Sequence, residues 1–190
     1  RSLVFSAWTA EERGLLGSEY YAAQPLLPLE TTVANFTMDV LQPNGLARDA
    51  VLVGAGQNEL ESLLTQKAAG QGRVVTPDAK PERGLAFRAD HFPFARRGVP
   101  ALLLMGMGGG HDLVNGGREA GDRWVADFTG KCYHQACDRW SESWDLRGAA
   151  QDVTLIYQMA SELANSRAWP QWNPGSEFKA VRDSTVAQRK

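Results

Sequence analysis

The sequence lacks any long apolar run. Its 190 residues are 43% hydrophobic, yet no stretch approaches the roughly 20 uninterrupted apolar residues of a membrane-spanning helix. No charged start followed by an apolar run marks a signal peptide either. The sequence therefore predicts no membrane span and shows no recognisable targeting signal.

An excess of charge of one sign is also missing. Lys and Arg number 20 and Asp and Glu number 22, so the formal net charge is -2, and the isoelectric point is about 5.9. Binding of nucleic acid or of an anionic membrane needs a dense basic patch, which this composition does not supply. We therefore expect one globular domain whose partner is small or neutral, not a nucleic acid.

Cysteine is rare. The two cysteines flank a histidine in the segment CYHQAC at residues 132–137. A closed zinc-finger site would need a second ligand pair, which is absent here. A local disulfide is sterically allowed and would indicate an oxidising compartment, and two free thiols are the alternative. The spacing leaves both states open.

An initiator Met is absent too. The first residues, RSLVFSAW, have the pattern of a buried strand without any lead-in. We therefore expect a domain cut from a longer protein, in which missing signals exclude nothing. A cut before an inner strand would expose a sheet edge, and pairing through that edge predicts a homodimer.

The rest of the sequence alternates between strand and helix patterns. Short apolar runs rich in β-branched residues predict strands, and apolar residues at helical spacing predict helices. The expected strands cover residues 3–8, 31–39, 50–53, 73–76 and 101–105, and the expected helices cover residues 14–24, 59–69, 92–97 and 145–164. This order predicts the α/β class.

Two segments lack such periodicity. Residues 106–143 are rich in Gly, Asp and aromatic residues, and compact domains usually keep long irregular stretches for function, so loops here are expected to build a site. The segment after Trp169-Pro170 has little pattern. We therefore divide the chain into a domain at residues 1–168 and a C-terminal tail at residues 169–190.

Two adjacent carboxylates, Glu11 and Glu12, lie where the first expected strand gives way to a helix. Sheets of α/β proteins bind ligands at this edge. A capping box between Thr9 and Glu12, with Glu11 favourably placed in the first helical turn, explains the same residues without any function. Taken alone, the pair favours a helix cap.

Two further residues gain meaning only in combination with this pair. Asp39 ends a strand before the turn sequence QPNG, and turn chemistry alone explains it. His134 lies among aromatic residues, where a lone His is usually structural. Together with Glu11 and Glu12, however, they are the oxygen and nitrogen ligands that hydrolytic zinc uses. A Glu that does not bind the metal could then move a proton from metal-acidified water to a leaving amine, which is peptide hydrolysis.

The ordered motifs of the chain resemble those of the zinc peptidases of family M28. They are FSAWTAEERGLLGSEYY at residues 5–21, TMD at 37–39, ADHFPFARRGVP at 89–100, and YHQACD at 133–138. The most specific element is the Glu-Glu pair followed by GLLGS. The resemblance covers most of the chain and implies a three-layer α/β fold, N-terminally truncated, with a mixed, mostly parallel sheet and helices on both faces.

Carried over position by position, the resemblance implies a site for two zinc ions. Glu11 would be the general base, and Glu12 a ligand of one zinc. Asp39 would be a ligand of the other zinc, and His134 the partner of Glu12. The family usually has Asn two positions before the aspartate, where this chain has Thr37, which changes the support of the ligand rather than the ligand itself.

The family's His-x-Asp motif, which supplies a terminal ligand and the bridging carboxylate, belongs upstream of the Glu-Glu pair, and nothing precedes Arg1 here. We therefore expect partial or empty zinc occupancy and little activity from this chain alone. Asp90, His91 and Tyr133 are the candidate substrate-binding residues. A solvated loop His is the alternative for His91, and His111 is expected in a flexible loop, so neither should bind the catalytic zinc.

The resemblance implies an aminopeptidase that acts on peptides with a free amino terminus, in a secreted or periplasmic protein. One alternative is a non-catalytic binding or scaffold module, because such domains are reused with degenerate metal sites. A further alternative is carboxypeptidase or glutaminyl-cyclase activity, which would differ in the pocket loops rather than in these ligands.

Overall fold

A four-stranded mixed sheet forms the centre of the computed structural model, which describes residues 1–189. The strand order is β1-β4-β2-β3, with the strands at Asn35–Met38 (β1), Asp49–Val53 (β2), Val74–Pro77 (β3) and Ala101–Leu104 (β4). The pairs β1–β4 and β2–β3 are parallel, whereas β2 and β4 are antiparallel. The predicted α/β class with a mixed, mostly parallel sheet is confirmed.

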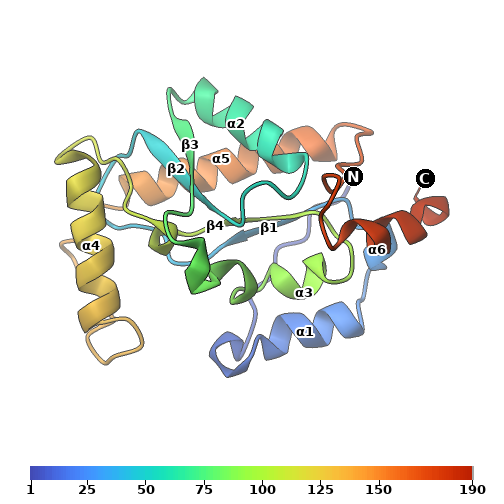
Figure 1. Cartoon of the computed structure of the whole chain (residues 1–190), viewed down its shortest axis with the longest axis horizontal. Coiled ribbons are helices and arrows are strands. Elements are labelled where there is room, and N and C mark those ends of the chain that lie inside the picture. Colours follow the sequence, from blue (N-terminus) through green and yellow to red (C-terminus); the bar gives the residue numbers. More distant parts are fainter. Residues whose placement is uncertain (190) are drawn as a thin grey trace.

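Helices cover both faces of this sheet (Figure 1). Helices α2 (Leu60–Gly70) and α5 (Arg147–Ala164) lie on one face, and α1 (Leu16–Ala23) and α3 (Phe92–Ala95) lie on the other. Helix α4 (Gly117–Lys131) stands at one end of the molecule and α6 (Lys179–Ser184) at the opposite end. Short 3-10 helices lie at Glu11–Arg13 (η1), Leu29–Thr31, Pro81–Arg83, Leu85–Phe87, Gly106–Gly108 and Val186–Gln188.

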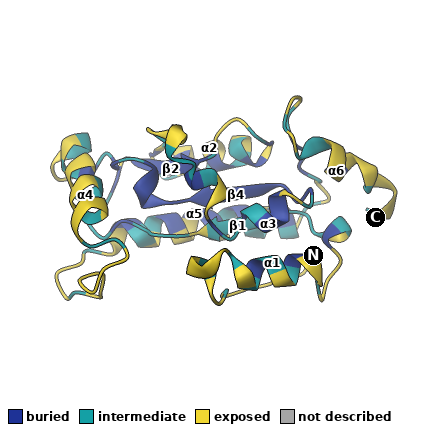
Figure 2. Cartoon of the chain, turned by 60° about the horizontal axis from the view of Figure 1, so that its bottom comes forward, coloured by how far each residue is buried: buried dark blue, intermediate teal, exposed yellow. Residues whose placement is uncertain are grey.

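The largest core lies between the sheet and the helices α2 and α5. Its fully buried members include Leu52, Leu64, Leu104, Leu155 and Met159. Figure 2 shows the central strands β2 and β4 almost entirely in the colour of buried residues. Burial of apolar side chains on both faces explains why these strands appear in the sequence as continuous apolar runs. Within the described residues, no helix is long and apolar enough to cross a membrane.

The strand predicted at residues 3–8 does not form. Residues 1–8 are without helix or strand, and Leu3, Val4 and Phe5 are 49%, 59% and 91% exposed. A strand exists only where a ladder of backbone hydrogen bonds pairs it with a neighbour. None of the backbone hydrogen bonds found in residues 1–189 joins residues 2–8 to a strand, so the apolar pattern alone does not make one.

The prediction that residues 106–143 are irregular is also wrong in part. Helix α4 occupies 15 of these residues, and its only buried member is Gly121. A helix that packs so sparsely needs no broad apolar stripe, so its sequence lacks the periodicity that would have predicted it. The segment after Trp169, divided off above as a tail, packs against the domain at Trp172, which is 3% exposed and whose Nε1 donates to the carbonyl of Gly98 at 2.8 Å.

Candidate metal centre

Glu11 and Glu12 occupy η1, between two residues with left-handed backbone. Ala10 has φ 55° and Leu15 has φ 59°, a conformation that non-glycine residues rarely adopt outside functional sites and tight turns. No side chain caps η1. The capping box of Thr9 with Glu12, the explanation without function, is therefore wrong, and the carboxylate of Glu12 is available for other contacts.

Gly17 explains why the motif after the carboxylate pair contains a second glycine. Its backbone N–H donates to the carbonyl of Thr9 at 3.0 Å. A Cβ atom at this position would lie 2.6 Å from the same oxygen. Only glycine therefore lets α1 begin directly against the loop that presents Glu11 and Glu12.

Glu12 contacts His134, which follows the end of α4. Glu12 Oε1 and His134 Nε2 are 2.8 Å apart, and the two side chains are 64% and 43% exposed. A polar contact this exposed contributes little to stability. Its members are instead accessible to a ligand. The ring of Tyr133 lies against the ring of His134, with centroids 3.8 Å apart.

Asp39 follows the last residue of β1 and is half-buried. Its backbone N–H donates to the carbonyl of Leu104 at 3.2 Å, and its Oδ1 accepts the N–H of Val40 at 2.7 Å. The hydroxyl of Thr37 donates to Asn35 Oδ1 at 2.9 Å rather than to the carboxylate of Asp39. Thr37, which stands where the family usually has Asn, therefore makes its hydrogen bond within the strand and not to Asp39.

Three carboxylates lie near enough to Glu11 to influence its charge. Burial and the negative charges of Glu12, Asp39 and Asp90 raise the pKa of Glu11 from 4.5 to about 7, and His134 opposes this rise only in part. Burial and the neighbouring charges of Asp90 and Glu12 likewise raise the pKa of Asp39. A concentration of negative charge of this kind favours a bound cation, because each carboxylate is then relieved of its neighbours' repulsion.

Asp90 belongs to this cluster through its position beside α1. Its Oδ1 accepts a hydrogen bond from the buried hydroxyl of Ser18 at 2.5 Å. Burial raises the pKa of Asp90 and this hydrogen bond lowers it, with burial prevailing. Sequence reasoning did not single out Ser18, although it lies inside the GLLGS motif.

Tyr133 also faces the acidic cluster. Burial raises the pKa of its phenol, Arg88 lowers it, and the charges of Glu12 and Asp39 raise it further. His91 is 7% exposed and its Nδ1 has no partner among the described residues. Burial lowers the pKa of His91 to about 4, so the alternative of a solvated loop histidine is wrong.

His111 lies elsewhere and is not in a solvated loop. It is 2% exposed, and its Nδ1 lies 3.5 Å from Oδ1 of the fully buried Asp49. The expectation of a flexible glycine-rich loop is therefore wrong. The loop is buried because the glycines before His111 let it approach other backbone closely: a Cβ at Gly110 would lie 2.1 Å from the nitrogen of Asp122.

Cys132 and Cys137 form a disulfide, so of the two states that the sequence left open the oxidised one is present. Their Cα atoms are 5.2 Å apart, the ordinary separation for this bond. The bond closes a short loop that contains His134.

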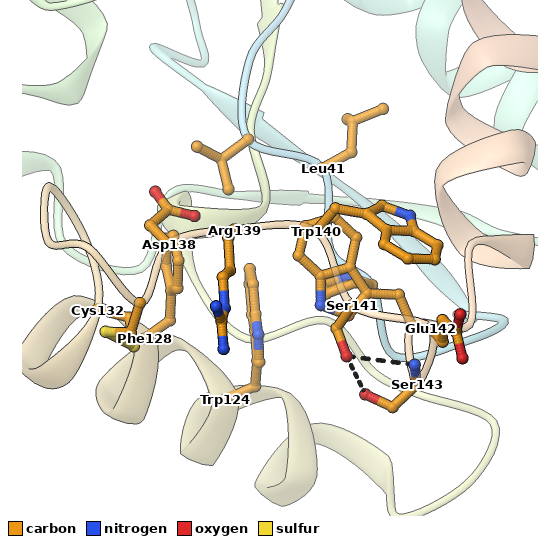
Figure 3. A pocket seen from close by; sticks show the side chains of 14 residues that line it. Leu41, Trp124, Phe128, Cys132, Asp138, Arg139, Trp140, Ser141, Glu142 and Ser143 are labelled. Carbon is orange, nitrogen blue, oxygen red and sulfur yellow. Dashed lines mark hydrogen bonds between the residues drawn. A yellow bond between two sulfur atoms is a disulfide. The ribbon is translucent and has the colours of Figure 1, made fainter.

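A cavity of about 790 Å³ opens beside this loop. Trp124 and Phe128 project into it from α4 with their rings stacked at 5.5 Å, and Trp140 contributes from the following loop (Figure 3). Val40, the neighbour of Asp39, also lines it. The sequence did not predict this cavity. The aromatic residues of the stretch 106–143 were a signal for it. Helix α4 was not predicted, however, so it could not be seen that Trp124 and Phe128 lie on the same side of a helix.

The sequence model of peptidase family M28 matches residues 1–158. The chain belongs to peptidase family M28. The family implies a peptidase, which is a hydrolase, and peptidases of this family typically depend on zinc. No individual curated protein matches the chain.

The donor chemistry and the surplus negative charge of this M28 site fit zinc, which takes imidazole nitrogen and carboxylate oxygen. The donor set is not closed, however. Within residues 1–189 no group of three or more His, Cys, Asp or Glu side chains converges to hold a metal ion. Glu12 and His134 supply two donors in contact, and Asp39 stands apart from them as a third candidate donor in the same cluster.

Proposed function

We propose that this M28 domain works as a zinc-dependent aminopeptidase, an exopeptidase that removes N-terminal residues from peptides. The observation that carries the proposal is the contact of Glu12 with His134 beside Glu11, whose pKa is raised to about 7. Glu12 and His134 would hold one zinc ion, and Asp39 would supply an oxygen ligand to a second. When bound, zinc supplies a Lewis acid that polarises the scissile carbonyl and acidifies water.

Glu11 is the proposed general base. A carboxylate whose pKa lies near 7 accepts a proton from the attacking water and can return it to the leaving amine, because neither form is strongly favoured at neutral pH. Its half-buried position strengthens this role, since burial is the largest cause of the raised pKa. Glu12 is more exposed and in contact with His134, which suits a ligand better than a base.

The acidic cluster supports an aminopeptidase over a carboxypeptidase. Asp39 and Asp90 add negative charge around Glu11, and such a site attracts the α-ammonium group of a peptide while it repels a terminal carboxylate. The aromatic cavity beside Asp39 would receive the side chain of the residue to be removed, with Tyr133 and Asp90 on the side of the acidic cluster. His91 would support this wall from within the core.

Zinc titration calorimetry on the chain tests the proposal. We expect weak binding, because the described donor set is open, and a further loss of about tenfold in the variants Glu12→Ala and His134→Ala. The matched control Glu119→Ala removes a carboxylate that is 85% exposed on α4 and should leave binding unchanged. If zinc binding is absent, or is equal in all four proteins, the scaffold alternative takes its place.

The catalytic part of the proposal has its own test. With zinc in excess, a peptide with a free amino terminus should be shortened slowly from that end, and the same peptide acetylated at its amino terminus should stay intact. The variant Glu11→Gln should retain zinc and lose this hydrolysis by a factor of about 100 or more. Release of the C-terminal residue instead would identify a carboxypeptidase.

We also propose that the protein is exported, to the periplasm or the cell exterior. The Cys132–Cys137 disulfide supports this location, because disulfides persist in oxidising compartments and are rare in the cytosol. Alkylation of free thiols in intact cells, followed by mass spectrometry, tests it: both cysteines should be protected.

A further inference from the structure

The disulfide encloses the histidine of the candidate metal centre. Cys132 directly follows the last residue of α4, Tyr133 and His134 come next, and Cys137 returns the chain to the helix end, where its sulfur lies 3.4 Å from the carbonyl of Lys131. The cross-link thus closes a loop whose third residue is the candidate ligand. Apart from the backbone itself, no other covalent cross-link joins this loop to the helix within residues 1–189.

His134 has a backbone conformation that a non-glycine residue adopts only in a minor population of an unconstrained chain. Its φ is 61°, in the left-handed region, which a non-glycine residue disfavours by about tenfold or more in population. His134 is the third residue of a turn that is closed by a hydrogen bond from Gln135 N–H to the carbonyl of Cys132 at 2.8 Å. This turn directs the imidazole toward Glu12, and the conformation persists only where the surroundings hold it.

The N–H of Tyr133 donates to the carbonyl of Phe128 at 2.8 Å, and the two rings lie 5.9 Å apart, so the beginning of the loop is held against α4. Beyond Tyr133, few contacts besides the disulfide hold the loop. Residues 134–140 are all exposed, and they form neither helix nor strand. The ring of His134 touches Tyr133 and Glu12, and Glu12 is itself 64% exposed. Exposed segments with few buried contacts open at low cost. The cross-link is therefore the strongest constraint on the position of His134.

We propose that the Cys132–Cys137 disulfide is a redox switch for the metal centre: the oxidised loop holds His134 against Glu12, and reduction releases it and weakens zinc binding. This inference rests on the proposed role of Glu12 and His134 as zinc ligands. The reductant is a dithiol. Its thiolate attacks a cystine sulfur, the S–S bond breaks, and two cysteine thiols form while the dithiol closes to its own disulfide, so that two electrons and two protons are transferred.

The disulfide is placed where a reductant can reach it. Cys137 is exposed and Cys132 is half-buried, and both line the open cavity beside α4 (Figure 3). Loss of the cross-link would therefore loosen the wall of this cavity together with the ligand. The same reaction would change both the metal site and the adjacent binding surface.

The test compares zinc affinity in two covalent states of the chain by titration calorimetry. One sample is oxidised, and the other is reduced and then alkylated with iodoacetamide, because free thiolates would themselves bind zinc. Reagents are removed before the titration. We expect the alkylated chain to bind zinc about tenfold more weakly, in line with the cost of the left-handed conformation. The double variant Cys132→Ser, Cys137→Ser should show the same loss, and oxidised protein treated with iodoacetamide alone should show none.

A second measurement does not depend on the metal. In the metal-free oxidised chain, proton NMR should show contacts between the rings of Tyr133 and His134, and these should disappear in the double serine variant while far-UV circular dichroism stays the same. Persistence of the ring contacts, or equal zinc affinity in both covalent states, would overturn the switch. If the switch were overturned in this way but Glu12→Ala and His134→Ala still weakened zinc binding, the proposed function would stand without the redox switch. If zinc binding did not depend on Glu12, both the proposed function and the redox switch would be contradicted.

Discussion

Glu11 differs from the other carboxylates of the chain in its surroundings. It is half-buried and lies beside Glu12, Asp39 and Asp90, and these conditions raise its pKa from 4.5 to about 7. The folded, metal-free chain therefore binds a proton at Glu11 more strongly than the unfolded chain does. Folded stability and protonation of this residue are consequently linked.

Glu11→Gln should flatten the pH dependence of stability. A folded pKa above the unfolded pKa contributes stability that is fully present below pH 4.5 and is lost as the pH rises to about 7. The free energy of unfolding of the metal-free chain should therefore fall between these two pH values, and it should fall less in Glu11→Gln. Urea denaturation with a chelator present measures this. Glu119→Gln, on exposed α4, is the control, and equal slopes in all three proteins would contradict the prediction.

His91 should have the opposite effect on acid stability. Burial lowers its pKa from 6.5 to about 4, so the neutral ring contributes stability that is present above pH 6.5 and is lost as the pH falls to about 4. The loss should reach roughly 3 kcal/mol. In His91→Gln, urea denaturation at the two pH values should show a smaller difference than in the parent chain. A variant that is as sensitive to acid as the parent would contradict the assignment.

At the scale of the elements, a buried polar network joins α4 to the sheet. Asp49, at the start of β2, is fully buried and accepts hydrogen bonds from Thr76 Oγ1 at 2.7 Å, the N–H of Asp112 at 2.8 Å and Arg118 at 2.6 Å. Burial raises the pKa of Asp49, but the neighbouring imidazole of His111, 3.5 Å away, and hydrogen bonds from Thr76 and Asp112 outweigh it and hold this pKa well below its usual range. Arg118 is the second residue of α4, so this network fixes the beginning of the helix whose end presents His134.

Asp49→Asn should destabilise the fold by about 3 kcal/mol or more, because it leaves Arg118 without its charged partner and removes acceptors from a buried site. Urea denaturation at neutral pH measures the change. Asp127→Asn is the matched control, since Asp127 pairs with Lys131 on the same helix but is 54% exposed, and it should change stability by less than about 1 kcal/mol. Equal effects of the two substitutions would show that the network contributes little.

The elements differ in how far the sequence predicts them, for a physical reason. Strands β2 and β4 and helices α2 and α5 were predicted within a few residues, because they form the main core and burial leaves a periodic apolar pattern. Helix α4 was missed because it buries so little. The strand at residues 3–8 was predicted from the same apolar pattern and is absent. A strand needs backbone hydrogen bonds to a neighbouring strand, and the sequence of one segment does not show whether such a neighbour is present.

The candidate site, like the fold, was predicted from the sequence only in part. Motif order identified Glu11, Glu12, Asp39 and His134, and the structure brings Glu12 and His134 into contact across more than 120 positions of sequence. The sequence did not predict the left-handed backbone of Ala10 and His134, nor the burial of His91 and His111. These depend on long-range contacts that no local pattern records.

At the scale of the whole molecule, the sheet ends in two edge strands, β1 and β3. β1 is the terminal strand in the order β1-β4-β2-β3, and Met38 at its end is 40% exposed. The apolar segment around Phe5 is exposed and unpaired by backbone hydrogen bonds to a strand within the described residues. An unpaired edge together with an exposed apolar segment of strand-like sequence invites association between copies.

We therefore expect the chain to form dimers that depend on concentration, with the segment around Phe5 of one copy against β1 of the other. Size-exclusion chromatography with light scattering across a wide range of concentration measures this. Phe5→Lys should shift the equilibrium toward the monomer, because it places a charge in an apolar contact. Tyr157→Lys is the matched control: Tyr157 is 67% exposed on α5, outside both residues 2–8 and β1, and its replacement should leave the equilibrium unchanged. If the parent chain stays monomeric at every concentration, residues 2–8 and β1 do not associate between copies. If both variants shift the equilibrium equally, the association depends on general surface hydrophobicity and not on this edge.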